Sequence, residues 1–215
     1  MKRCPFAFEI LMGETGAFRR KLGAAWPQIT QFLDRNHIHN FSLWSCGQLA
    51  FGYCEREEEE KLPGKERAAL SDLLEAFTDC VSWIAQPGDG MRLMYHDFGI
   101  VRENKEMIRH RVFMTRLKPG CAEEYKRRHD GLIEARGDQP DPGPDSNFSI
   151  WTGGGYIFGY DEIDTSMEAD ETQEAHEGTV AWESRQLGIM DWISNDVDWL
   201  TDSFHPPVIR LGWHE

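Results

Sequence analysis

The stretch "NFSLWSCGQLAFGYCE" (Asn40–Glu55) returns later in the chain as "NFSIWTGGGYIFGYDE" (Asn147–Glu162). Nine of the 16 aligned positions are identical, where composition alone predicts roughly one match. The offset is 107 residues with no gap, and at that offset "GETGAFRRKL" (Gly13–Leu22) aligns with "GCAEEYKRRH" (Gly120–His129). The chain is therefore a tandem duplication of one structural unit.

The later parts of the two copies also correspond. The segment "SWI" (Ser82–Ile84) matches "DWI" (Asp191–Ile193) after a shift of two residues. The two ends, "LMYHD" (Leu93–Asp97) and "LGWHE" (Leu211–Glu215), resemble each other as well. We therefore divide the chain into a first repeat, residues 1–103, and a second repeat, residues 104–215.

Both repeats predict the same order of elements. Short apolar strands are expected at 6–12 and 110–117, followed by helices at 15–35, kinked at Pro27, and from Ala122 to Gly137. Two strands joined at Cys46-Gly47 or Gly153–Gly155 come next, because glycine suits the positive φ of hairpin turns. A second helix (about 65–85 and about 171–201) and a last strand complete each repeat.

This order, β-α-β-β-α-β, is that of a ferredoxin-like unit, whose sheet carries helices on one face only. The bare face of such a sheet needs a cover, and a tandem copy can supply it. The predicted fold class is α+β, with two ferredoxin-like repeats packed as an intrachain dimeric α+β barrel.

Composition limits the function. The chain has 215 residues, of which 40% are hydrophobic, and a formal net charge of −14. Such an acidic chain repels phosphate backbones and anionic lipid heads, so nucleic acid and membrane surfaces are not expected partners. A neutral small molecule remains as the expected ligand.

The five cysteines are odd in number and form no C-x-x-C pair, which predicts reduced thiols and neither a disulfide framework nor a zinc site. The N-terminal "MKRCPFAFEILMGETG" has a short apolar run broken by Glu9, which predicts a first strand and not a signal peptide. No apolar run is long enough to span a membrane. A cytoplasmic location is the expectation.

Tyr125 and His129 lie four residues apart on the predicted helix and share one of its faces. Their counterparts in the first repeat are Phe18 and Leu22, which belong to an apolar stripe. The phenol and the imidazole are therefore predicted to point toward the sheet. Such a histidine can be a catalytic group or a buried side chain satisfied by hydrogen bonds.

The second repeat resembles the L-rhamnose mutarotase family in the run "EEYKRRH", in Asn147 followed by an aromatic residue, in a helix-2 tryptophan and in the closing "GWHE". Members of that family are small dimeric α+β barrel proteins. The resemblance implies that His129 is the proton donor and that Tyr125, Phe148 and Trp192 line a sugar site. It further implies that no metal or other cofactor is required.

This sequence departs from the family pattern at two positions. The aromatic residue after Asn147 is usually Tyr, but here it is Phe148, which cannot hydrogen-bond to a sugar hydroxyl. Asp191 stands where the family has one of two indoles. Tyr156 is a further candidate for sugar contact because the first repeat has Leu49 there, whereas Trp151 and Tyr160, kept as Trp44 and Tyr53, indicate core.

Mutarotation opens a cyclic hemiacetal and recloses it on the other face. It needs one proton delivered to the ring oxygen and one removed from the anomeric hydroxyl, and histidine suits either task near neutral pH. Tyr125, Asp130 and Asp191 are all candidates for the second proton-transfer group.

The leading hypothesis is an aldose mutarotase that acts on L-rhamnose or a related 6-deoxy sugar, with the second repeat catalytic. A non-catalytic module that binds or senses a monosaccharide is the first alternative. A cofactor-free oxygenase of the same fold is another, which oxygen uptake would reveal.

Overall fold

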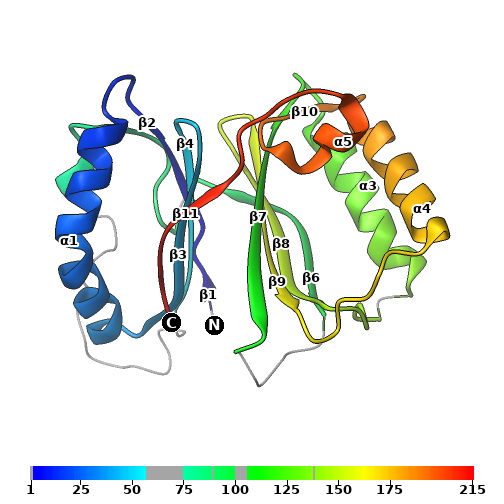
Figure 1. Ribbon diagram of the computed structural model, residues 1–215, viewed down its shortest axis with the longest axis horizontal. Helices are drawn as coiled ribbons and strands as arrows, with labels where there is room; N and C mark the ends of the chain where they lie inside the picture. The colour runs from blue at the N-terminus through cyan, green and yellow to red at the C-terminus, as the bar shows by residue number, and fades with distance from the viewer. Residues whose placement is uncertain (1, 57–74, 89, 100–105, 138) are drawn as a thin grey trace. The chain divides into compact units, whose positions relative to one another are not determined.

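The computed structural model describes residues 2–56, 75–88, 90–99, 106–137 and 139–215. The chain forms two compact units, one made of Met1–Met91 with Ile209–Glu215 and the other of Arg92–Val208. Each unit contains one antiparallel sheet with helical structure against one of its faces (Figure 1). The predicted α+β class with two ferredoxin-like halves is confirmed.

The first unit has a six-stranded sheet in the order β11-β3-β4-β2-β5, with β1 also paired to β4. Its long helix α1 (Thr15–Arg35) runs through Pro27 without interruption. The strands are β1 (Lys2–Arg3), β2 (Phe6–Ile10), β3 (Ile38–Cys46), β4 (Leu49–Arg56), β5 (Val81–Ala85) and β11 (Ile209–His214).

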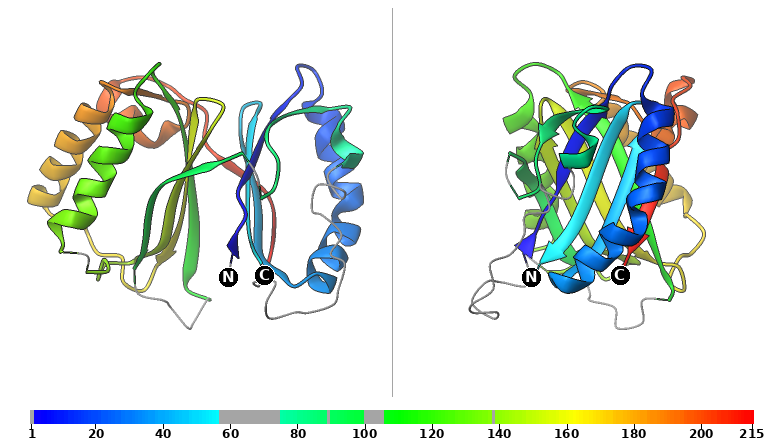
Figure 2. Two further views of the ribbon diagram at one scale, coloured as in Figure 1. Left: turned by 180° about the vertical axis from the view of Figure 1, so that it is seen from behind. Right: turned by 90° about the vertical axis from the view of Figure 1, so that its left-hand side faces the viewer.

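The second unit has a five-stranded sheet in the order β10-β7-β9-β8-β6. Figure 2 shows α3 and α4 side by side on the same face of this sheet. The strands are β6 (Arg92–Gly99), β7 (Ile108–Leu117), β8 (Asp145–Gly153), β9 (Tyr156–Asp164) and β10 (Met190–Trp192). The helices are α3 (Ala122–Ala135), α4 (Gln173–Gln186) and α5 (Asp198–Thr201), the last preceded by a 3₁₀ turn at Asn195–Val197.

The last strand of each repeat lies in the sheet of the other repeat. The fourth strand of the ferredoxin-like unit is β5 in the first repeat and β10 in the second. Each of them pairs with the first strand of its own repeat. The closing segments form an additional strand, so that β6 pairs with β8 and β11 pairs with β3. They satisfy the backbone groups at an otherwise open sheet edge. The compact units therefore have different boundaries from the sequence repeats, 1–103 and 104–215.

The prediction that the tryptophans of "SWI" and "DWI" lie on second helices is wrong. Trp83 lies on β5 and Trp192 on β10. Helix α4 ends at Gln186, and Met190 and Trp192 are buried on either side of the exposed Asp191, which is the alternation of a strand. Most of the helix predicted at about 65–85 lies outside the described residues, which show a 3₁₀ turn at Glu75–Phe77 and then β5.

Two repeated residues have a backbone role. Gly47 and Gly154 both have φ of 59° and occupy the hairpin turns, as predicted. Asn40 and Asn147 have φ of 51° and 48° and lie at equivalent register shifts, between β3 and β4 and between β8 and β9. Asparagine tolerates this left-handed conformation better than most residues. The repeated asparagine therefore sets a β-bulge in each sheet.

Each unit has its own apolar core between sheet and helices. In the first unit, the buried face of α1 packs on the sheet through Phe18, Leu22, Ile29 and Leu33. In the second, Tyr125 belongs to the corresponding cluster. All five cysteines have free thiols. No helix among the described residues is long and apolar enough to cross a membrane.

Candidate functional site

Helix α3 directs Tyr125 and His129 toward the sheet of the second unit. They are the buried residues of this helix, 1% and 5% exposed. The solvent side of α3 carries ion pairs, including Lys126 with Asp130 at 2.7 Å and Arg128 with Glu124 at 2.8 Å. The amphipathic pattern thus fixes which face is turned inward, as predicted from the first repeat.

The two side chains contact each other directly. Their rings stack with centroids 4.2 Å apart and planes inclined by 29°. His129 Nδ1 lies 2.9 Å from the backbone oxygen of Tyr125. Because a carbonyl oxygen can only accept, Nδ1 must carry the hydrogen. In the neutral imidazole, Nε2 is therefore the basic nitrogen.

Aromatic side chains enclose the imidazole. The Trp182 ring on α4 meets it edge-on at 5.1 Å between centroids, and the Tyr95 ring on β6 meets it at 5.5 Å. Tyr95 also contacts Phe148 at 5.4 Å. Tyr95 belongs to the first repeat by sequence, so both repeats supply side chains around His129.

Burial shifts the pKa of both groups toward the neutral form. Desolvation lowers the pKa of His129, although the hydrogen bond to the Tyr125 carbonyl and the charge of Asp130 act in the opposite direction. Desolvation raises the pKa of Tyr125 well above its usual value, and the charge of Glu183 adds to that rise. At neutral pH, His129 is thus an uncharged base and Tyr125 an uncharged phenol.

Two of the predicted sugar contacts lie in this aromatic layer. The Phe148 ring contacts Tyr95 and lies 6.3 Å from the Phe113 ring. Trp192 packs against Phe113 at 5.5 Å, and its buried Nε1 has no hydrogen bond. The tryptophan that actually lies on the second helix is Trp182, which the sequence reading did not select.

The other two residues predicted to contact the sugar have no contact with His129 in the described structure. Asp191 is exposed, between two buried neighbours on β10, and lies 3.9 Å from Lys118. Neighbouring side chains of a strand point to opposite faces, and Ile157 belongs to the core between the sheet and the helices. Tyr156 therefore points to the other face of β9. Its hydroxyl accepts a hydrogen bond from Arg116 at 2.6 Å. Both residues stay predictions for sugar binding.

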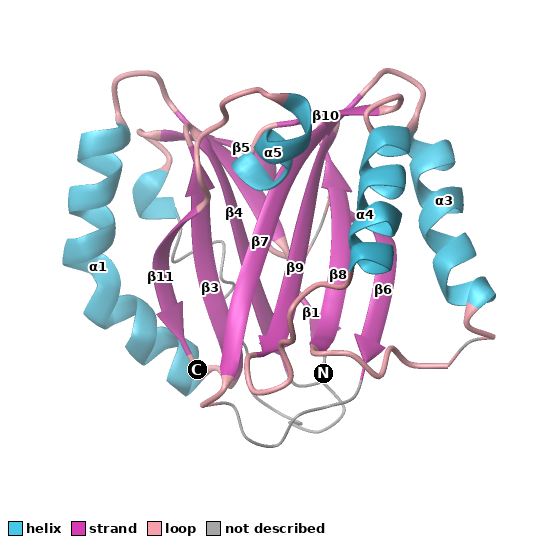
Figure 3. Cartoon of the chain, turned by 45° about the vertical axis from the view of Figure 1, so that its right-hand side comes forward, coloured by secondary structure: helices cyan, strands magenta, loops and turns pink. Residues whose placement is uncertain are grey.

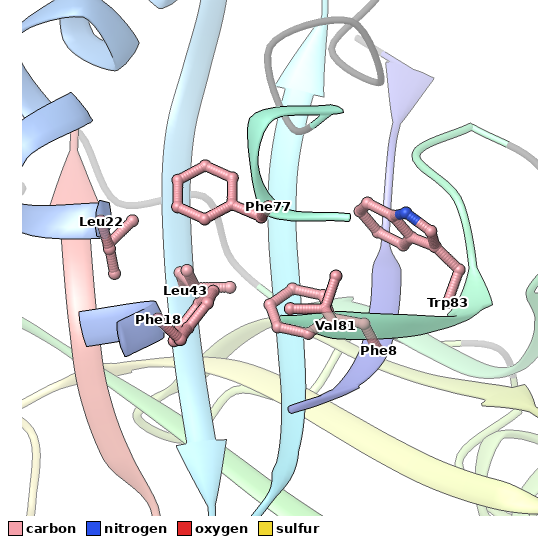
Figure 4. A pocket seen from close by; sticks show the side chains of 7 residues that line it. All are labelled: Phe8, Phe18, Leu22, Leu43, Phe77, Val81 and Trp83. Carbon is pink, nitrogen blue, oxygen red and sulfur yellow. The ribbon is translucent and has the colours of Figure 1, made fainter. Parts of the chain in front are cut away.

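The helix-facing layer of the second unit is polar where that of the first is apolar. At the offset of 107 residues, the pairs are Arg111 with Cys4, Thr115 with Phe8, Tyr125 with Phe18, His129 with Leu22 and Asp161 with Cys54. Figure 4 shows the matching place in the first unit, where Phe18 and Leu22 point toward Phe77. Only about 10 Å³ is empty there, and the seven lining side chains are all apolar. The inner layer of the second unit is therefore the one that carries titratable side chains.

Two carboxyl groups in this polar layer were missed. Glu183 is on α4, and burial raises its pKa to about 7, while Arg111 acts in the opposite direction. Asp161 is 2% exposed, and burial together with the charge of Asp145 raises its pKa to about 8. A comparison of Asp161 with Cys54 would have identified that position from the sequence, because a buried thiol is replaced by an acid. The described residues contain no group of three or more side chains arranged to hold a metal ion.

The sheets and helices together define an α+β protein built from two ferredoxin-like halves. The family model for L-rhamnose mutarotase matches residues 110–203, which contain Tyr125, His129 and Trp182. The resemblance found in the sequence is thereby confirmed over these residues, which make up less than half of the chain.

Comparison with solved structures gives a weaker likeness. A proposed monooxygenase from Fusobacterium nucleatum matches with a TM-score of 0.45 and 7% sequence identity, covering 87% of this chain and 86% of the other. No function is transferred from a likeness at this level. No curated protein matches the chain.

Proposed function

We propose that this protein is an aldose mutarotase, which interconverts the α and β anomers of L-rhamnose or a related 6-deoxy sugar in its second unit. The observation that carries the proposal is the fixed tautomer of His129, whose Nδ1 is held at 2.9 Å by the Tyr125 carbonyl oxygen. This contact leaves Nε2 as a base inside a segment that matches the L-rhamnose mutarotase family.

The reaction requires only proton transfers. His129 Nε2 removes the proton of the anomeric hydroxyl while the bond between C1 and the ring oxygen breaks, and the ring oxygen takes up a proton. Reclosure on the opposite face of C1 reverses these transfers. An imidazole that is neutral at pH 7 can take up this proton and return it when the ring closes again.

The aromatic residues supply the proposed sugar contacts. Phe148 and Trp192 offer apolar surface for the C–H groups of a pyranose ring. Phe148 offers no hydroxyl, so its contact with the sugar is apolar and contributes no hydrogen bond. Tyr125 keeps the imidazole in place by stacking.

We further propose that the two units pair within one chain, with the sheet faces opposite the helices toward each other. Both repeats keep the same aromatic residues on those faces, with Trp44, Phe51 and Tyr53 corresponding to Trp151, Phe158 and Tyr160. All six are buried. Sedimentation analysis that found the units spread apart in solution would contradict this arrangement.

A non-catalytic sugar-binding module is the second candidate. It is favoured by the enclosure of His129, which is 5% exposed and surrounded by Tyr95, Tyr125 and Trp182. A sugar that touches Nε2 therefore requires one of these rings to move.

One measurement separates the two candidates. Saturation-transfer NMR on L-rhamnose reports the rate of anomer exchange, and line broadening of the same signals reports binding. A mutarotase accelerates exchange in proportion to its concentration. Binding that leaves the exchange rate at its uncatalysed value would establish the module instead.

A further inference from the structure

Two of the five cysteines lie opposite each other on neighbouring strands of the first unit. The last pair in the antiparallel register of β1 and β4 is Arg3 with Glu55, and both strands are labelled in Figure 3. One step further along this register, Cys4 lies opposite Cys54. The backbone N–H of Cys4 donates to the backbone oxygen of Cys54 at 2.8 Å, which holds the two residues together.

The two thiols lie on the same face of the sheet. Both belong to the core that the sheet shares with α1, and they are 2% and 0% exposed. Cys54 Sγ lies 3.7 Å from the backbone oxygen of Cys4, and the two thiols hydrogen-bond to each other. Residues directly opposite in an antiparallel pair have Cα atoms about 4.5–5.5 Å apart, within the range of ~4.4–6.8 Å that a disulfide spans. A bond between the two sulfurs therefore needs side-chain rotation but no change of strand register.

The other three cysteines have neighbours of a different kind. Cys80 Sγ donates to the backbone oxygen of Phe77 at 3.2 Å. Cys121 Sγ lies 3.8 Å from a backbone oxygen two residues earlier in the chain. Cys46 lies opposite Leu49 in the register of β3 and β4. The dithiol geometry is therefore specific to one pair.

The second repeat also has a matched pair of side chains at this place in its sheet. At the offset of 107 residues, Arg111 corresponds to Cys4 and Asp161 to Cys54. These two residues are partners in the register of β7 and β9, and the charge of Arg111 opposes the rise in the pKa of Asp161. The two positions thus hold opposite charges in one repeat and two thiols in the other, which indicates that the cysteines act as a pair.

The surroundings of the pair make Cys4 the nucleophile. The hydrogen bond from the Cys54 thiol lowers the pKa of Cys4 to about 7, and the charges of Arg56 and Lys2 act in the same direction, against the effect of burial. The same hydrogen bond and burial raise the pKa of Cys54. Because the thiolate is the form that attacks an oxidant, Cys4 reacts first and Cys54 is the thiol that follows.

Strand β1 covers the pair but is weakly attached. It has two residues and pairs with β4 alone among the described strands. Pro5 follows Cys4 and has no N–H to donate to the ladder. Opening of residues 2–4 therefore breaks few backbone hydrogen bonds, and such segments open at a low cost in free energy. This opening admits a small oxidant to Cys4.

We propose that Cys4 and Cys54 form a redox-active dithiol, a reversible modification site that a hydroperoxide oxidises to a disulfide. The inference concerns the first unit and goes beyond the sugar chemistry proposed for the second. The two proposals are independent, so either can fail without the other.

The oxidation balances with the two thiols and one peroxide. The Cys4 thiolate attacks a peroxide oxygen, the O–O bond breaks, and a sulfenic acid forms while hydroxide leaves. This hydroxide takes the proton of the Cys54 thiol. The Cys54 sulfur then attacks the Cys4 sulfur, the S–O bond breaks, and the departing hydroxide takes the proton that Cys4 released at the start. Two electrons pass from the sulfurs to the peroxide, which is reduced to water.

The modification is tested on the full chain with hydrogen peroxide, which catalase then removes before the remaining thiols are alkylated in denaturant. Mass spectrometry should show that the five free thiols fall to three, with Cys4 and Cys54 in one cross-linked peptide. Dithiothreitol should restore the missing thiols. A full set of alkylated thiols after peroxide, or a disulfide between a different pair, would overturn the proposal.

Two variants test the order of the steps. In Cys54→Ala the oxidation should stop at the sulfenic acid of Cys4, which dimedone traps. Cys121→Ser removes the cysteine that is more exposed than the pair and is the matched control, so its Cys4–Cys54 cross-link should form at the wild-type rate. Oxidation of Cys121 ahead of Cys4 in the wild type would mean that exposure alone decides reactivity, and it would overturn the role of the pair.

Thermal melting tests whether the strands already have the geometry of the disulfide. The bond would join residues 50 apart in the chain, so oxidation should raise the melting temperature of the wild type by roughly 5 °C or more. The same treatment should leave the melting temperature of Cys54→Ala unchanged. An oxidised wild type that melts below its reduced form would show that the bond distorts the sheet, and it would overturn the assignment.

Discussion

The imidazole of His129 lies against the phenol ring of Tyr125, with ring centroids 4.2 Å apart, and the backbone oxygen of Tyr125 accepts its Nδ1 hydrogen. One residue thus fixes both the plane and the tautomer of the other. This arrangement needs only the helical spacing of four residues, which returns the side chain of His129 to the carbonyl of Tyr125.

His129→Leu copies the residue that the first repeat has at the same position, Leu22. We expect the change to slow anomer exchange by roughly 10²–10⁴-fold, since a positioned acid or base contributes about that much. The melting temperature should change little, because the first unit buries a leucine there. Saturation-transfer NMR and a thermal melt are the measurements.

The reciprocal change, Leu22→His, is the matched control and should create no activity. Phe18 replaces the tyrosine next to it, and the surrounding space of about 10 Å³ admits no sugar. Tyr125→Phe should cost less rate than His129→Leu, since the stacking ring remains. A folded His129→Leu protein with full exchange would remove the basis of the mutarotase proposal.

The pH dependence of exchange should show an acid limb below pH 6.5. Burial lowers the pKa of His129 from its ordinary value of 6.5, so the neutral base persists to lower pH and is lost as the pH falls through the lowered pKa. The limb should disappear in His129→Leu. A wild-type rate that stays flat from about pH 8 to about pH 4.5 would count against histidine as the base.

Much of the fold was predictable because the duplication presents the sequence pattern of each element twice. The helix over 15–35 and the hairpins at Gly47 and Gly154 follow from apolar spacing and from glycine, which are local signals. Which sheet the closing strands join is not determined by their local sequence. Pairing of β6 with β8 and of β11 with β3 is decided by which sheet edge is open.

The site was predictable in part for a similar reason. Tyr125 and His129 differ from Phe18 and Leu22 within an aligned helix, and the alignment alone places them inward. Trp192 was assigned to a helix because the strand that contains it has only three residues. A segment this short does not distinguish the period of a helix from that of a strand in the sequence. Tyr95 and Glu183 approach the layer from β6 and α4, and only tertiary structure brings them there.

Each sheet should be intolerant of a methyl group at one repeated glycine. A Cβ at Gly159 would overlap the Phe113 ring, and one at Gly52 would overlap the Phe6 ring. We expect Gly159→Ala and Gly52→Ala to destabilise the protein by about 1–3 kcal/mol each, as overpacking does. Gly23→Ala, which meets nothing within 4 Å, is the control. Chemical denaturation measures all three, and wild-type stability in the first two would show that the phenylalanine rings can move aside.

Asp161 should make the stability of the protein depend on pH. Its side chain is 2% exposed, Oδ1 has no hydrogen bond, and burial raises its pKa from 3.8 to about 8. Because the folded-state pKa is raised, the contribution to stability is complete below the unfolded-state pKa and is lost as the pH rises from about 4 to about 8.

Asp161→Asn removes that loss, and Asp161→Cys installs the Cys54 side chain of the first repeat. Both variants should melt higher than the wild type at pH 8, by about 2–4 °C for each kcal/mol gained, with the advantage shrinking toward pH 4. Asp170→Asn, at an exposed position, is the control and should melt like the wild type throughout. Melting curves that keep the same spacing between wild type and Asp161→Asn from pH 4 to pH 8 would mean that this carboxyl is ionised in the folded protein as readily as in the unfolded one.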